Sequence, residues 1–61
     1  MKYQIYKDNQ KLWRWSFVSK NGETIGVSSE SYQNRKDCLK SIVLIKNSFD
    51  APVEDVSSEK L

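Results

Sequence analysis

The sequence predicts an α+β fold, a β-β-β-α-β unit in which an antiparallel meander carries one helix packed on one face. Before residue 29, short segments place apolar residues at every second position, and turn-forming residues separate them. From about residue 34, apolar residues recur every three or four positions, which is typical of an amphipathic helix. Beyond Pro52, which stops the helix, residues 53–56 are long enough for a short edge strand.

The first two predicted strands cover residues 3–7 and 12–18, with polar turn residues 8–11 between them. In the second strand the aromatic side chains alternate with polar ones, so they share one face and are expected in the core. The two sets are Trp13, Trp15 and Phe17 on the core face, and Arg14, Ser16 and Val18 on the outer face.

A tight turn and a third strand follow. The turn contains Asn21 and Gly22, residue types that tolerate a positive φ. The third strand is predicted over residues 24–28, with Ile25 and Val27 pointing inward and Thr24 and Ser28 outward. The next residues are expected to pin the start of the helix: Ser29, Glu30 and Tyr32.

The helix is predicted to begin near Asn34 as its N-cap and to end within residues 50–52. Asp37 lies in the first turn, where a carboxylate suits the helix dipole. One apolar stripe should cover the aromatic face of the sheet, and it contains Cys38, Ile42, Ile45 and Phe49.

Further apolar residues lie beside this stripe, where a solvated helix face does not need them. We expect them to contact a second subunit, together with the two valines of the last strand. The candidate dimer contacts are Leu39, Val43, Leu44, Val53 and Val56.

The size of the chain also favours a dimer. A chain of 61 residues forms one domain with a marginal core, and folds this small usually need a disulfide, a metal or a partner. One cysteine excludes an internal disulfide, and the absence of histidine excludes the usual zinc sites. Oligomerisation is the remaining means of stabilising the fold, and a well-packed monomer is the alternative.

Charge and hydropathy indicate a soluble domain. Residues 1–46 carry nine Lys/Arg and four Asp/Glu, a net +5, and residues 47–61 carry one Lys and four Asp/Glu, a net −3. Either these charges are an ordinary solvated surface, or the acidic tail docks on a basic surface of its own chain or of a partner subunit. No membrane-spanning run or secretory signal is evident, so a cytoplasmic location is expected.

Several segments in this order resemble the YegP-like domain, a small bacterial and archaeal family without an assigned activity. They are Ile5-Tyr6-Lys7-Asp8, Trp13-Arg14-Trp15, Asn21-Gly22-Glu23, Ser29-Glu30-Ser31-Tyr32 and the helix with Ile42, Ile45 and Asn47. The resemblance covers residues 3–56. Together with the chain length, it predicts a single domain over residues 1–56, and the terminal residues 57–61 are expected to form a flexible tail. It also implies a homodimer in which two units exchange their C-terminal strands. The chain departs from the pattern at Cys38 and Leu39 and in the short stretch after Pro52.

The residues offer little for catalysis or cofactor binding. Without histidine, Ser-His-Asp and Cys-His arrangements are excluded, and there is no glycine-rich phosphate loop. Cys38 lies near a helix N-terminus, which favours a reactive thiol, but it also lies on the apolar stripe, which favours a core residue. We therefore predict no enzymatic activity, no cofactor, no metal and no small-molecule substrate.

The function predicted from the sequence is a small interaction or structural module that acts as a homodimer. The alternative is weak binding of nucleic acid or another anion by the outer face of the sheet, through base stacking and positive charge. The candidate residues for that surface are Tyr6, Arg14, Lys7 and Lys11.

Overall fold

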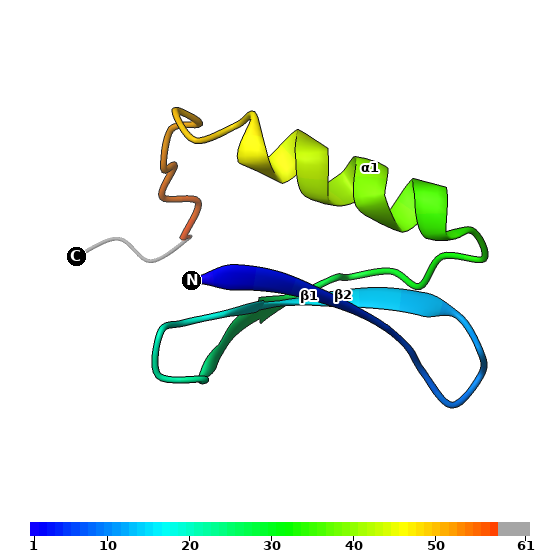
Figure 1. Cartoon of the computed structure of the whole chain (residues 1–61). Helices are drawn as coiled ribbons and strands as arrows, with labels where there is room; N and C mark the ends of the chain where they lie inside the picture. Colours follow the sequence, from blue (N-terminus) through cyan, green and yellow to red (C-terminus); the bar gives the residue numbers. More distant parts are fainter. Residues whose placement is uncertain (58–61) are drawn as a thin grey trace.

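The computed structural model describes residues 1–57 as a three-stranded sheet with one helix on one face (Figure 1). Strands β1 (Lys2–Lys7), β2 (Trp13–Val18) and β3 (Thr24–Val27) form an antiparallel meander in the order β1-β2-β3, and helix α1 (Arg35–Lys46) follows. The three predicted strands and the helix are confirmed. The predicted flexible tail, 57–61, lies outside the described residues except for Ser57.

The pairing of β1 with β2 is regular, and it puts the aromatic residues on the face that α1 covers. Tyr3 lies opposite Phe17 and Ile5 lies opposite Trp15, so these side chains share that face. Tyr3 contacts the ring of Trp15 edge-on at 5.5 Å between centroids.

The pairing of β2 with β3 contains a bulge that changes which β3 residues face the core. Val18 pairs with Thr24, but Phe17 pairs with Gly26, so Ile25 is an extra residue without a partner. Gly26 therefore takes the inward position, and Val27 pairs with Ser16 on the outer face. The prediction that Ile25 and Val27 point into the core was wrong, and both side chains are more than half exposed.

The same shift turns Ser28 inward, against the prediction of an outer position. Ser28 is buried, its N–H donates to the Trp15 carbonyl at 2.9 Å, and its Oγ accepts the Trp15 N–H at 3.3 Å. Beyond it, Tyr32 exchanges two backbone hydrogen bonds with Trp13. The link between β3 and α1 is thus tied back to β2 by hydrogen bonds from two of its residues.

Helix α1 contributes two buried residues to the core, Cys38 and Ile42. Trp15, Cys38 and Ile42 form the buried cluster, and five partly buried residues surround it: Tyr3, Ile5, Trp13, Phe17 and Tyr32. The continuation of the predicted stripe was wrong, because Ile45 is 43% exposed and Phe49 is 92% exposed.

The helix also ends earlier than predicted. Asn47 is its C-cap, and hydrogen-bonded turns occupy residues 47–50, so Pro52 lies well beyond the end of the helix. At the other end Asn34 is the N-cap residue, as predicted, but its side chain bonds Asp37 rather than the backbone.

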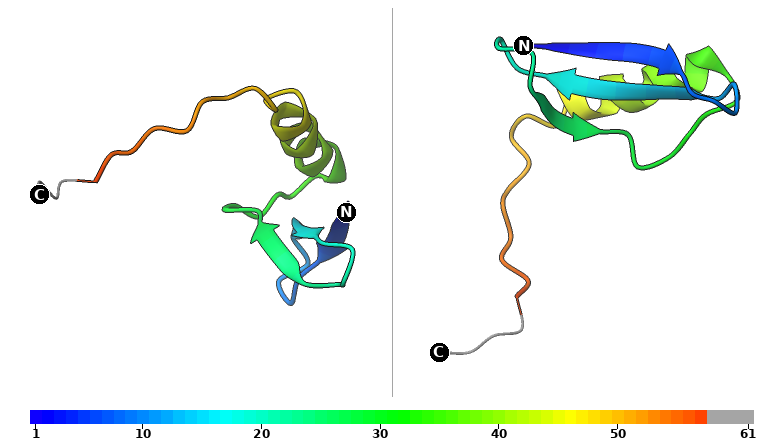
Figure 2. Two further views of the ribbon diagram at one scale, coloured as in Figure 1. Left: turned by 90° about the vertical axis from the view of Figure 1, so that its left-hand side faces the viewer. Right: turned by 90° about the horizontal axis from the view of Figure 1, so that it is seen from below.

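The predicted fourth strand is not formed within the single chain. Residues 51–57 have no regular secondary structure, and after α1 the chain runs away from both the sheet and the helix (Figure 2). Up to Ser57, the segment that follows Pro52 makes no hydrogen bond to β1, β2 or β3. The five-element unit is therefore incomplete in one chain.

Candidate functional site

The outer face of the sheet brings together two of the predicted binding residues. Tyr6 on β1 lies directly opposite Arg14 on β2, so the phenol and the guanidinium share one face. The next row of that face contains Gln4, Ser16 and Val27. The paired strands thus present a polar surface with one exposed aromatic ring, Tyr6.

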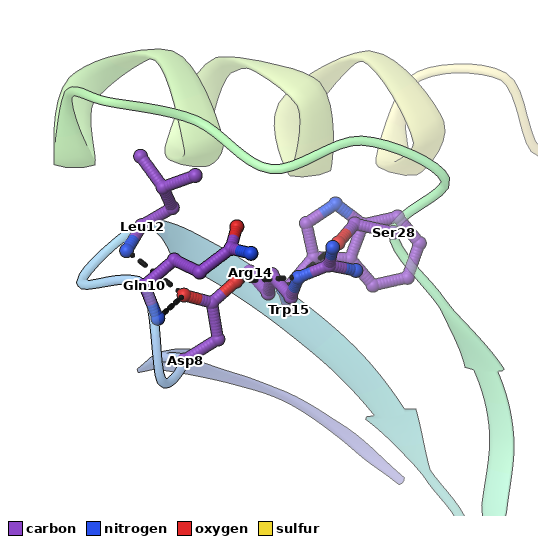
Figure 3. Close-up of polar contacts among 6 residues, drawn as sticks. All are labelled: Asp8, Gln10, Leu12, Arg14, Trp15 and Ser28. Atoms are coloured by element: carbon purple, nitrogen blue, oxygen red, sulfur yellow. Dashed lines mark hydrogen bonds and ion pairs between the residues drawn. The ribbon is translucent and has the colours of Figure 1, made fainter.

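Arg14 is held in an ion pair by a turn residue. The Nε–H of Arg14 donates to Oδ2 of Asp8 at 2.8 Å (Figure 3). The second carboxylate oxygen, Oδ1, accepts the backbone N–H groups of Gln10 at 2.8 Å and Leu12 at 3.0 Å. The backbone hydrogen bond from Leu12 and then the side-chain bond from Arg14 lower the pKa of Asp8. The carboxylate therefore stays ionised and neutralises much of the charge that Arg14 would offer a ligand.

The two lysines predicted beside Tyr6 do not complete a basic patch. Lys7 pairs with Trp13, so it belongs to the opposite face, and its Nζ lies 5.3 Å from the Trp13 ring centroid. Lys11 lies in the turn that follows β1, in a left-handed conformation with φ 63°. Of the four predicted residues, the sheet register therefore places only Tyr6 and Arg14 side by side.

Basic side chains instead border the aromatic core on the helix side, which the sequence reasoning missed. Arg35 lies 5.8 Å from the Trp13 ring centroid, and Lys46 lies 6.0 Å from that of Tyr3. At these distances a cation is attracted by the electrons of the ring. Arg35 and Lys46 are three helical turns apart, so both lie on one flank of α1. This spacing could have indicated from the sequence that the two cations share a side of the helix.

Cys38 has the surroundings of a core residue. Its side chain is fully buried, and burial raises the pKa of the thiol, while the nearby Arg35 charge opposes that shift. Its carbonyl accepts the hydroxyl of Ser41, whose Oγ in turn accepts the indole N–H of Trp15 at 2.9 Å. The prediction that Cys38 lies in the core is confirmed.

The predicted dimer contacts are exposed apolar side chains. On α1, Val43 is 52% exposed and Leu44 is 69% exposed, and Leu39 lies at the border of exposure. In the segment after the helix, Val53 is 100% exposed and Val56 is 79% exposed. Ile45 and Phe49, expected in the core, are exposed as well. The described chain therefore leaves seven large apolar side chains of α1 and its C-terminal extension exposed, from 36% for Leu39 to 100% for Val53.

Within residues 1–57, no helix has the length and apolar character that crossing a membrane requires.

Three comparisons bear on the identity of the chain. The model of the family described as a domain of unknown function, DUF1508, matches residues 8–55. A UPF0339 protein from Treponema denticola is 39% identical over 56 residues, covering 90% of this chain and 95% of that protein. A UPF0339 protein from Neisseria meningitidis serogroup B is 33% identical over 57 residues, covering 92% of this chain and all of that protein.

A solved structure shares the fold. The solution NMR structure of a protein from Haloferax volcanii superposes with a TM-score of 0.81 at 25% identity, covering 90% of this chain and 93% of that one. The family model and the UPF0339 relatives confirm the family that the sequence resembles, and the structural match confirms the fold. The chain therefore belongs to the DUF1508 family of YegP-like domains, whose function is unknown.

Proposed function

We propose that this protein is a non-enzymatic interaction module that acts as a homodimer. The observation that carries the proposal is the apolar surface of α1 and residues 49–56, which is exposed in the single chain. Its members are Leu39, Val43, Leu44, Ile45, Phe49, Val53 and Val56. Large apolar side chains left exposed in this number are typical of a chain that makes a protein–protein contact.

The small core gives a reason why a second copy would bind here. The buried cluster of the described residues contains Trp15, Cys38 and Ile42, and Val18 is buried apart from it. A chain of this size gains little stability from such a core. Burying one valine, leucine or phenylalanine side chain contributes about 1.5–3 kcal/mol, so covering several of the exposed ones would stabilise the fold substantially.

The C-terminal segment supports an exchange between two copies. After α1 and the turns over residues 47–50, the chain extends away from its own sheet (Figure 2). Exchange of an identical element between two copies through such a hinge is a low-cost route to a dimer. The strand exchange that the family resemblance implies would use residues 53–56.

The solution mass tests this proposal. Light scattering at micromolar concentration with a reductant present should give twice the 7.1 kDa mass of the chain. Truncation after Asn47 should abolish the dimer and lower the free energy of unfolding, whereas truncation after Ser57, the matched control, should leave both unchanged. A monomeric full-length chain, or a truncation at Asn47 that stays dimeric, would contradict the proposal.

The observations favour this module over the nucleic-acid surface. The Asp8 carboxylate neutralises Arg14, and Lys7 lies on the other face of the sheet from Tyr6. Binding of single-stranded nucleic acid rests on stacking together with unpaired positive charge along the strand. Strong salt-sensitive binding that Arg14→Ala weakens would reverse this preference.

A further inference from the structure

We infer that the surface between β1 and the adjacent flank of α1 binds the phosphate backbone of a single-stranded nucleic acid. Three exposed cations lie along this surface, Lys7, Arg35 and Lys46, hereafter the basic strip. The inference goes beyond the proposed homodimer and does not depend on it, because one chain supplies all three side chains. The basic strip lies on the helix side of the sheet, and Tyr6 and Arg14 lie on the outer face.

Partly buried aromatic rings hold the three charges in place. The Nζ of Lys7 lies 5.3 Å from the Trp13 ring centroid, and the Cζ of Arg35 lies 5.8 Å from the same centroid. The Nζ of Lys46 lies 6.0 Å from the ring centroid of Tyr3. Attraction to a ring restricts a flexible cationic side chain without removing its charge. Less side-chain entropy is then lost when an anion binds.

No carboxylate pairs with these cations in the part of the chain that the structure describes. The only ion pair among the described residues joins Arg14 to Asp8, on the outer face. Asp37, in the first turn of α1, lies about 200° around the helix from Arg35 and bonds the side chain of Asn34. The basic strip therefore keeps its positive charge, whereas the charge of Arg14 is neutralised.

The length of the basic strip fits a polymer better than a small anion. Arg35 and Lys46 are eleven positions apart on α1, which is about 16 Å along the helix axis. A stacked nucleic-acid strand places successive phosphates about 3.4 Å apart along its axis, so about five nucleotides span both ends of the strip. Arginine and lysine are both phosphate ligands, arginine through its planar fork and lysine as a point charge.

A single strand is the polyanion that this surface fits best. Surfaces that bind single strands combine basic side chains along the backbone with aromatic rings. Trp13 and Tyr3 are partly exposed beside the three charges. A single strand, unlike a duplex, has unpaired bases that can reach such rings. An acidic peptide carries carboxylates only where its sequence has them, whereas every nucleotide carries a phosphate.

Two matched pairs of lysine substitutions test the inference. Lys46→Gln is compared with Lys40→Gln, since both lysines are exposed on α1 and lie about 120° apart around it. Lys7→Gln is compared with Lys2→Gln, since an odd number of positions separates them on β1 and puts them on opposite faces. Binding is measured by fluorescence anisotropy with a labelled single-stranded DNA of about 12 nucleotides. Far-UV circular dichroism should show that all four variants fold.

The salt dependence of binding reports the number of phosphate contacts. For the wild type, log K plotted against log salt should have a slope of about −2, the value for three contacts to a single strand. Lys46→Gln and Lys7→Gln should each weaken binding at least about threefold and bring the slope about 0.7 closer to zero. Lys40→Gln and Lys2→Gln should each change the affinity less than about twofold. No binding at about 25 mM salt, or an equal loss in either matched pair, would overturn the inference.

Competitors and Arg14→Ala identify the partner and the face. A duplex of the same sequence and a polyglutamate peptide of equal charge should each displace the labelled strand at least about tenfold less well than the unlabelled single strand. Equal displacement by either competitor would overturn the assignment to a single strand. Arg14→Ala should leave binding unchanged. A loss with Arg14→Ala and none with Lys46→Gln would place the binding on the outer face and overturn the inference.

Chemical acetylation of the wild-type protein reports the contact without any substitution. With excess single-stranded DNA, Lys7 and Lys46 should be acetylated at least about threefold more slowly, because bound phosphates shield them. Lys2 and Lys40 should react at an unchanged rate, and mass spectrometry measures all four. Equal protection of the four lysines, or protection of none, would overturn the inference.

Discussion

The Asp8 carboxylate joins the turn after β1 to the outer face of β2, because one oxygen accepts the Arg14 Nε–H at 2.8 Å and the other accepts two backbone N–H groups. The same carboxylate therefore stabilises the turn and holds the side chain that most resembled an anion-binding group. The relationship is local in sequence, since Arg14 follows Asp8 by six positions. The ion pair gives Arg14 a structural role in place of the ligand contact that the sequence predicted.

The depressed pKa of Asp8 makes stability depend on pH in the acid range. Its folded-state pKa lies below the ordinary value of 3.8, so the unfolded chain binds the proton more tightly. The stabilisation is fully present above pH 3.8 and is lost as the pH falls through the folded-state pKa. Asp55, whose pKa is lowered by hydrogen bonds from Ser57, titrates in the same direction.

We expect Asp8→Asn to lower the melting temperature at pH 7 and to flatten its dependence on pH below about 4. Thermal unfolding from pH 7 to pH 2 measures both effects, with Glu30→Gln as an exposed control that should retain the wild-type slope. An Asp8→Asn variant with the same acid slope as the wild type would show that Asp8 contributes nothing to it.

Ser41→Ala should destabilise the fold by about 1 kcal/mol, because the Trp15 indole N–H loses its acceptor in a partly buried site. Urea unfolding monitored by tryptophan fluorescence measures the change. Ser48→Ala is the matched control. The Ser48 hydroxyl is exposed, and it donates to the Leu44 carbonyl at the C-terminal end of α1 rather than to a core residue. Equal losses in the two variants would contradict a role for the Trp15–Ser41 bond.

Cys38 should react slowly with a thiol reagent while the protein is folded. The side chain is fully buried and its raised pKa keeps it as the thiol, so labelling requires an opening of the structure. We expect labelling in urea to be faster by on the order of 100-fold or more. Lys20→Cys in a Cys38→Ala background is the exposed control, because Lys20 is exposed in the turn between β2 and β3. Rapid labelling of native Cys38 would instead point to a reactive thiol.

Gly22→Ala should destabilise the β2–β3 hairpin by about 1 kcal/mol, because Gly22 has a φ of +86°, which L side chains rarely adopt. Gly26→Ala provides the comparison, since its φ is not positive and its Cβ would meet open space. Chemical denaturation of both variants measures the difference. A Gly22→Ala variant as stable as Gly26→Ala would show that this turn relaxes without cost.

The order and type of the elements were predictable because hydrophobic periodicity is a local property. The alternating aromatic residues predicted that the Trp face of β2 points inward, and the spacing of Cys38 and Ile42 predicted that α1 packs on that face. The exposed helix residues Leu39, Val43 and Leu44 were also predicted from that spacing. Their exposure agrees with the structure, whereas their role as dimer contacts stays a prediction.

The residues whose placement was wrong depend on contacts that a local pattern does not contain. Without the bulge, Ile25 and Val27 would have faced the core, and a shift of one residue in pairing sends Val27 to the outer face. Ile45 and Phe49 have the correct helical spacing, but the helix ends at Lys46 and its core contacts centre on β2, so both remain exposed.

The sequence by itself determined the α+β composition, the three-stranded meander, the position of the helix and the burial of Trp15, Cys38 and Ile42, since each follows from the spacing of apolar residues along the chain. The tertiary structure alone decided the face of Val27, the pairing of Arg14 with Asp8, and the exposure of the second half of the apolar stripe. Strand register and the reach of one element over another are set by long-range packing, in which a one-residue bulge reverses the face of every residue beyond it.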